Sequence, residues 1–79
     1  MRHHLKVSIR HEDKVGVLSH CFKAFSEAGW NVQELENIVF KDRHACVANI
    51  TIDGDFSHKE KVAAQLAENK DILSVSFIA

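Results

Sequence analysis

The sequence lacks the residues that build several common binding sites. It has only three glycines, at positions 16, 29 and 54, so it contains neither a glycine-rich phosphate loop nor the GxGxxG fingerprint of a dinucleotide-binding domain. Its two cysteines, Cys21 and Cys46, form no CxxC motif and no disulfide framework. We therefore expect buried free thiols in a cytoplasmic protein, and no cofactor bound to this segment.

Charge of one sign and long apolar runs are missing as well. The formal net charge is −1 with neutral histidines, and the lysines and arginines are scattered along the chain. This distribution argues against nucleic-acid binding, which normally uses a clustered basic face. No run of about 18 apolar residues is present, so we expect no membrane span, and the N-terminus lacks the apolar region of a signal peptide.

The chain of 79 residues corresponds to a single domain, 1–79, with its core from about residue 4 onward. Apolar residues make up 46% of the chain, which is enough to form a core. A domain this small buries a limited fraction of its surface, so pairing with a second copy or with a larger protein would add buried area.

Two segments have the apolar periodicity of helices. We expect Asp13 or a neighbouring group to cap the first helix and Gly29 to end it. The second helix is expected to begin at a capping box, in which Ser57 is followed three residues later by Glu60. The expected apolar positions are Leu18, Cys21, Phe22 and Phe25 in the first helix, and Val62, Ala63, Leu66 and Ala67 in the second.

Four further segments have the alternation or the β-rich composition of strands. The segment 31–40 alternates imperfectly, as in an edge strand, whereas 44–52 has one clean apolar face formed by Cys46, Ala48, Ile50 and Ile52. The order strand, helix, strand, strand, helix, strand predicts an α+β ferredoxin-like βαββαβ sandwich, a four-stranded antiparallel sheet with two helices on one face. The four predicted strands are 5–10, 31–40, 44–52 and 72–78.

This fold serves many functions, so the side chains must decide between them. The first loop has no cysteine pair for a copper chaperone, and the strand 44–52 has no aromatic residue on which RNA bases would stack. No GxSxG-type turn activates Ser8 or Ser19, so the segment alone is not expected to be an enzyme.

Six histidines raise the question of a metal site. Neither the His3–His4 pair nor His11 with His44 has a carboxylate or cysteine partner at a familiar ligand spacing, so we expect no metal. The histidines at positions 20 and 58 are expected on solvated helix faces.

The most informative stretch is residues 11–18, HEDKVGVL, between the first strand and the first helix, together with residues 29–31, GWN, after that helix. Over residues 4–79 the chain resembles an ACT domain, most closely the C-terminal serine-sensing regulatory domain of D-3-phosphoglycerate dehydrogenase. In that family the loop commonly reads His-x-Asn-x-Pro-Gly-Val-Leu. Four positions match, His11, Gly16, Val17 and Leu18, and two depart, Asp13 and Val15.

The resemblance implies a regulatory domain that binds an amino-acid effector, L-serine, at a homodimer interface. Two copies would join through their second strands into an eight-stranded sheet. His11 and Asp13 of one copy and Asn31 of the other would then hold the effector. The resemblance also implies that the parent protein is an NAD-dependent oxidoreductase of serine biosynthesis, a phosphoglycerate dehydrogenase.

The chemistry of the residues agrees with such a site. Gly16 has no Cβ to obstruct a ligand at the helix N-terminus. The amides of Val17 and Leu18 and the helix dipole favour an α-carboxylate there. Asn31 offers both a donor and an acceptor, and His11 can bond a ligand hydroxyl.

The two departures change the expected binding. An ionised Asp13 cannot donate to a carboxylate, so it takes the ligand ammonium or caps the helix. A charged hydrogen bond contributes about 1.5–3 kcal/mol, so the change alters affinity by about one to two decades. Valine in place of proline at position 15 costs a further ~0.4–1 kcal/mol in loop entropy.

Two other functions fit the same residues. The chain would be a ligand-free association module of a larger enzyme or a transcription regulator, or a free-standing ACT protein that senses another amino acid. In the first case His11 is a strand-end histidine, Asp13 an N-cap and Gly16 a turn residue.

Overall fold

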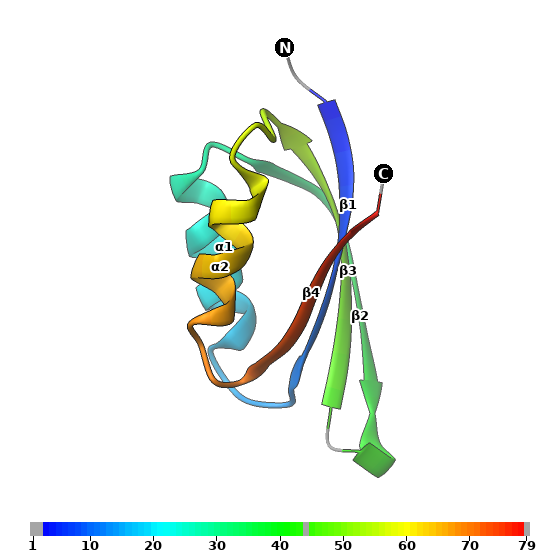
Figure 1. Ribbon diagram of the computed structural model, residues 1–79. Helices are drawn as coiled ribbons and strands as arrows, with labels where there is room; N and C mark the ends of the chain where they lie inside the picture. The colour runs from blue at the N-terminus through cyan, green and yellow to red at the C-terminus, as the bar shows by residue number, and fades with distance from the viewer. Residues whose placement is uncertain (1–2, 44, 79) are drawn as a thin grey trace.

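The computed structural model describes residues 3–43 and 45–78 and contains one antiparallel sheet with both helices on one face (Figure 1). The strand order is β2-β3-β1-β4, so β2 and β4 are the edges. This arrangement confirms the predicted βαββαβ sandwich. The elements are β1 (His3–Glu12), α1 (Val17–Glu27), β2 (Asn31–Phe40), a 3-10 turn (Lys41–Arg43), β3 (Ala45–Gly54), α2 (Lys59–Ala67) and β4 (Ile72–Ile78).

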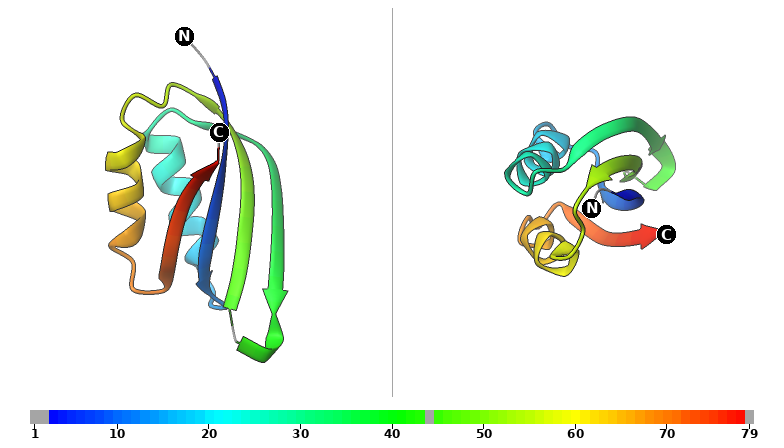
Figure 2. Two further views of the ribbon diagram at one scale, coloured as in Figure 1. Left: turned by 45° about the vertical axis from the view of Figure 1, so that its right-hand side comes forward. Right: turned by 90° about the horizontal axis from the view of Figure 1, so that it is seen from above.

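The core lies between the sheet and the two helices, which stand together on one side when the molecule is seen from above (Figure 2). Trp30 closes one end of this core: its ring stacks on Phe25 with centroids 5.6 Å apart, and its Nε1 donates to the carbonyl of Asp55 at 2.8 Å. The predicted apolar face of β3 is confirmed. The main buried residues are Val7, Ile9, Ala48, Ile50 and Ile52 from the sheet, and Val17, Cys21, Ala24, Phe25, Val62 and Leu66 from the helices.

The end of α1 agrees with its prediction. Gly29 has φ +78°, a left-handed conformation that glycine adopts without a Cβ clash. The amide of Gly29 donates to the carbonyl of Ser26 at 3.0 Å, and the amide of Trp30 donates to that of Phe25 at 2.9 Å. These two bonds form a Schellman motif, which satisfies the last carbonyls of the helix.

Both predicted N-terminal caps are wrong. The N-cap of α1 is Gly16, without a side-chain cap, and Asp13 lies elsewhere. At α2 the N-cap is His58. Ser57 does not cap this helix because its amide and hydroxyl both donate to Asp55, at 3.0 and 2.8 Å. These hydrogen bonds lower the pKa of the Asp55 carboxyl.

The buried face of α1 is rotated relative to the predicted one. Phe22 remains 36% exposed, because Val17 and Ala24 take its place in the core. His20 is half-buried, not solvated as expected. It shares a helix flank with Glu27, whose carboxylate accepts a bond from Gln65 of α2 at 3.3 Å. This flank of α1 therefore faces α2, and the Phe22 flank faces the β2 side of the sheet.

Each edge strand contains an irregularity. In β2 the pairing with β3 shifts between Val32 and Glu34, which leaves Gln33 as an extra residue. In β4 a similar shift opposite Arg10 and His11 leaves Leu73 unpaired with β1. The predicted bounds of these two strands are confirmed at both ends.

Candidate functional site

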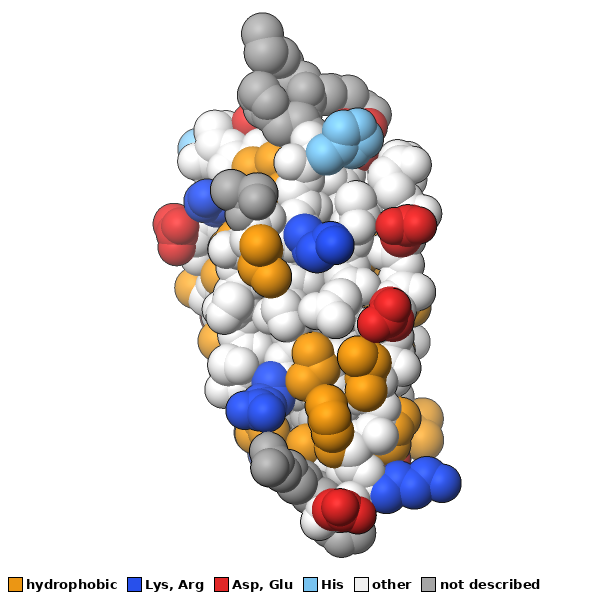
Figure 3. Space-filling view, turned by 90° about the vertical axis from the view of Figure 1, so that its right-hand side faces the viewer, with side chains coloured by type: hydrophobic (Ala, Val, Ile, Leu, Met, Phe, Trp, Pro, Cys, Tyr) orange, Lys and Arg blue, Asp and Glu red, His pale blue; other side chains and the backbone are white. Residues whose placement is uncertain are grey.

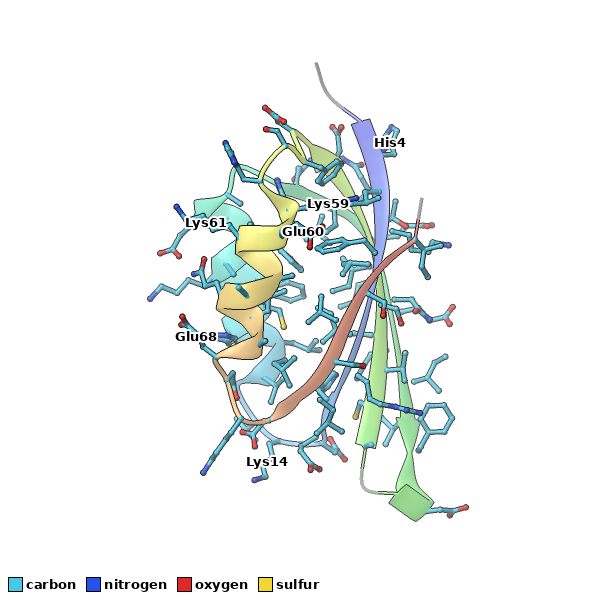
Figure 4. The ribbon with its side chains drawn as sticks, in the orientation of Figure 1. His4, Lys14, Lys59, Glu60, Lys61 and Glu68 are labelled. Carbon is cyan, nitrogen blue, oxygen red and sulfur yellow. The ribbon has the colours of Figure 1, made fainter. Side chains whose placement is uncertain are left out.

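Five of the six predicted ligand residues lie together at one end of the molecule, where Lys14 marks the β1–α1 loop (Figure 4). Asn31 lies at the other end, as the first residue of β2 and opposite Asp53. The eleven residues of α1 separate the two places, a length of about 16 Å. Within one chain the structure therefore does not bring Asn31 to the others. The five residues are His11, Asp13, Gly16, Val17 and Leu18.

His11 is held on both sides of its ring. It is only 3% exposed, and its Nδ1 lies 2.8 Å from the carbonyl oxygen of Glu12. Its Nε2 lies 3.2 Å from the side-chain oxygen Oδ1 of Asn37. Both partners are oxygens that only accept, so each contact is a hydrogen bond when the ring nitrogen that faces it carries the proton. This contact reaches across β3 and joins β1 to the edge strand β2.

The thiol of Cys46 lies between these strands. It pairs with His11 on one side and with Val39 on the other, and it is 1% exposed. Burial raises the pKa of the Cys46 thiol, and the neighbouring Asp13 carboxylate raises that pKa further. The side chain of Asn37 also affects this pKa and lowers it. A thiol kept protonated in this way is not a nucleophile.

We call these four residues, His11, Asp13, Asn37 and Cys46, the polar cluster. Sequence reasoning missed Asn37 and Cys46 as members. The alternation of 31–40 contains a signal for the first, since Asn37 is a polar residue between Leu35 and Val39 on the same face. Asn37 can be assigned to the cluster only when the register of β1, β3 and β2 is known, and the sequence alone does not provide that register.

Beside the polar cluster the N-terminus of α1 is open. Gly16 has φ +90°, and a Cβ built on it would meet no atom within 4 Å. No side chain caps the first amides of the helix, which therefore remain available to an anion. Two contacts with Asp71 brace the loop: its carboxylate lies 3.3 Å from Lys14 Nζ, and its carbonyl accepts from the Glu12 amide at 2.8 Å.

The site thus presents hydrogen-bond donors and a carboxylate close together. The helix amides suit a ligand carboxylate, and Asp13 suits a ligand ammonium. A cavity of about 460 Å³ lies at the end of β2 and is lined by Val39, Phe40, Lys41 and Asp42, none of which is a predicted site residue. Another, of about 340 Å³, lies between the ends of the helices beside Trp30 and contains none of the predicted site residues.

The free edge of β2 is rich in exposed apolar side chains. Residues opposite each other in a sheet share a face, so Leu35 and Val39, opposite Ile50 and Cys46, lie on the helix side. Ile38 and Phe40 lie on the open side, where hydrophobic side chains gather toward the lower part of the face (Figure 3). The exposed fractions of Leu35, Ile38, Val39 and Phe40 are 42%, 38%, 44% and 41%.

Metal binding finds no support among residues 3–43 and 45–78, where no three His, Cys, Asp or Glu side chains are placed to hold an ion. His44 and the side chain of His3, which belong to the two histidine pairs considered above, lie outside the described residues. Neither helix in the described part of the chain is long and apolar enough to cross a membrane. Cys21 and Cys46 are buried free thiols, as expected.

Similar folds occur in several solved structures. The ACT domain from GTP pyrophosphokinase of Chlorobium tepidum has a TM-score of 0.77 and 16% identity, covering 99% of this chain and 100% of that one. The acetolactate synthase small subunit from Thermotoga maritima has a TM-score of 0.79 and 19% identity, and the match covers 98% of this chain and 48% of that one. A homoserine dehydrogenase from Thiobacillus denitrificans has a TM-score of 0.77 and 11% identity, and the match covers 99% of this chain and 17% of that one. At these identities the likeness concerns the fold alone.

Sequence comparison identifies the family. No curated protein matches the chain significantly. A family model described as the AHAS small subunit-like ACT domain matches residues 7–74, which is most of the chain and includes β1 from Val7 onward, the polar cluster and both helices. The chain therefore belongs to the AHAS small subunit-like ACT domains.

Proposed function

We propose that this chain senses a free amino acid and regulates a larger enzyme, with L-serine as the first candidate effector. ACT domains are typically regulatory modules that bind amino acids. The observation that carries the proposal is the uncapped N-terminus of α1 at Gly16, in the same β1–α1 loop as Asp13. These two features match the two charged groups of an amino acid.

In the proposed complex the ligand carboxylate accepts from the amides of Val17 and Leu18, and the ligand ammonium donates to Asp13. The Nε2 atom of His11 already contacts Asn37. A serine hydroxyl would therefore compete with Asn37 for this nitrogen.

The sixth residue comes from a second copy. Antiparallel pairing of two β2 strands brings the start of β2 in one copy toward the end of β2 in the other. The polar cluster lies near that end, because Cys46 pairs with Val39. Asn31 of the partner subunit thus reaches the site, and the two-fold symmetry creates two identical sites per dimer.

Regulation then follows from the position of the ligand between two copies. An effector that contacts both copies stabilises the paired arrangement by its difference in affinity for the two states.

We propose a phosphoglycerate dehydrogenase as the parent enzyme. The family match favours, as a second candidate, a regulatory chain like the acetolactate synthase small subunit. The exposed apolar edge of β2 also supports an association module that needs no ligand.

A thermal-shift scan of the chain against the twenty amino acids tests the proposal. At a hundred times Kd, one bound ligand stabilises the fold by about 2.7 kcal/mol, which raises the midpoint by several degrees in a domain of this size. We expect a shift with serine that disappears in Asn31→Ala. Asn49→Ala, in β3 opposite Ser8 and Glu36, serves as the matched control and should keep the shift. A scan without any shift would contradict ligand sensing and leave the association module.

A further inference from the structure

We propose that two copies of this chain pair their β2 strands in a single register centred on Asn37, so that the two Asn37 side chains meet on the two-fold axis. The inference rests on the proposed pairing of β2 edges and adds the register and the residue at its centre. A strand that pairs antiparallel with its own copy has one residue that faces itself. The identity of that residue fixes every other contact along the edge.

The bulge in β2 limits the choice. The ladder with β3 is regular from Glu34, opposite Thr51, to Phe40, opposite Ala45, and it is interrupted at Gln33. A bulge bends its strand and disrupts pairing there. Two copies of the regular segment Glu34–Phe40 overlap fully only when its middle residue, Asn37, faces itself.

The side chains match in this register. On the helix side, Leu35 faces Val39 of the partner subunit, and these two side chains are 42% and 44% exposed in the single chain. On the open side, Glu36 faces the partner's Ile38, and Glu34 faces the partner's Phe40. No carboxylate of the segment faces another carboxylate. Apolar pairs directly opposite each other stabilise a sheet.

The registers on either side are less favourable. Centring on Ile38, on one side, leaves only the five residues Glu36–Phe40 of the regular segment paired. The registers on the other side bring like charges together. Centring on Glu36 places two Glu36 carboxylates opposite each other, and centring on Leu35 places Glu34 opposite the partner's Glu36 on both sides of the axis. Like charges directly opposite destabilise a sheet. Both registers also extend the ladder through the bulge at Gln33.

A central Asn37 would connect the two ligand sites. Its side-chain oxygen lies 3.2 Å from His11 Nε2. Residues that face each other across an antiparallel pair have Cβ atoms about 4.5–5.5 Å apart, which lets two amides hydrogen-bond. A chain of polar contacts then leads from His11 through both Asn37 amides to the partner's His11. Displacement of one Asn37 by a ligand hydroxyl therefore alters the other site.

The rate at which single cysteine variants form disulfide-linked dimers shows which residue lies on the two-fold axis. Facing residues have Cα atoms about 4.5–5.5 Å apart, within the range of a disulfide, whereas each one-residue step away from the axis separates the pair further. We expect Asn37→Cys to form a disulfide-linked dimer on oxidation, at least about tenfold faster than Leu35→Cys or Glu36→Cys. The unsubstituted chain, with its buried Cys21 and Cys46, is the background control. Fastest crosslinking at position 35 or 36 would overturn the register.

A second pair of variants tests the same point without a disulfide. Asn37→Asp and Gln33→Glu each convert one amide of β2 into a carboxylate, but only the first places two charges on the proposed axis. We expect Asn37→Asp to weaken dimerisation about tenfold and Gln33→Glu to leave it within about twofold, as measured by sedimentation equilibrium. Equal weakening of dimerisation by Asn37→Asp and Gln33→Glu would refute the register. A monomer of the unsubstituted chain at all concentrations would refute the proposed dimer itself, and the register with it.

Discussion

Burial determines the chemistry of the two thiols. Cys21 is fully buried in the core, and desolvation raises the pKa of its thiol to about 11. Burial and the Asp13 carboxylate raise the pKa of Cys46 in the same direction. Both thiols are therefore protonated at neutral pH. In Cys46 the retained proton keeps the sulfur uncharged near the Asp13 carboxylate, so two negative charges do not meet in the polar cluster.

The raised pKa of Cys21 predicts a loss of stability in alkaline solution. The unfolded chain releases this proton near pH 9.0, whereas the folded chain retains it until about pH 11, so the free energy of unfolding should fall as the pH rises through this window. Urea unfolding at several pH values across the window measures the slope. Cys21→Ala lowers stability at every pH through lost packing but should have a shallower slope. Equal slopes in the two proteins would contradict the prediction.

At the scale of elements, Gly29 illustrates a position that only glycine occupies without strain. Its φ of +78° lies in the left-handed region, and it forms the Schellman motif that ends α1 and turns the chain toward Trp30. A Cβ at this φ costs roughly 1–2 kcal/mol. No atom lies within 4 Å of such a Cβ, so the strain is confined to the backbone.

Gly29→Ala should therefore lower the free energy of unfolding by roughly 1 kcal/mol, with a fall of about 4–8 °C in Tm. Differential scanning calorimetry measures the change. Ser26→Ala, at an exposed position of α1, serves as the control and should leave the Tm nearly unchanged, because alanine is a good helix former. An unchanged Tm in Gly29→Ala would show that the left-handed conformation is not maintained in solution.

The elements could be predicted from the sequence, but most contacts between them could not. The alternation of β3, the apolar content of β2 and β4, and Gly29 as a stop signal are local properties, and each led to the observed element. The predicted caps failed for two reasons: Ser57 bonds Asp55, and the N-cap position of α1 is Gly16, which has no side chain to accept from the helix amides. Asn37 was missed because its meeting with His11 depends on the register of β1, β3 and β2 together.

At the scale of the whole molecule, the single chain contains two separated halves of the candidate site. The open N-terminus of α1 and Asp13 lie at one end, and Asn31 lies at the other. The β2 edge between them is apolar and unpaired in the single chain, which is the situation that association with a second copy corrects. In the proposed dimer each ligand site is therefore shared between two subunits.

Mixing two inactive variants tests this sharing of the site most directly. Asp13→Ala and Asn31→Ala should each bind no serine by isothermal titration calorimetry. A mixed dimer would contain one intact site, made from Asp13 of one copy and Asn31 of the other, and one site that lacks both. In an equimolar mixture, half of the dimers are mixed, so the account predicts about one quarter of the original number of sites at the original affinity. A mixture that binds no more serine than either variant alone would contradict a shared site.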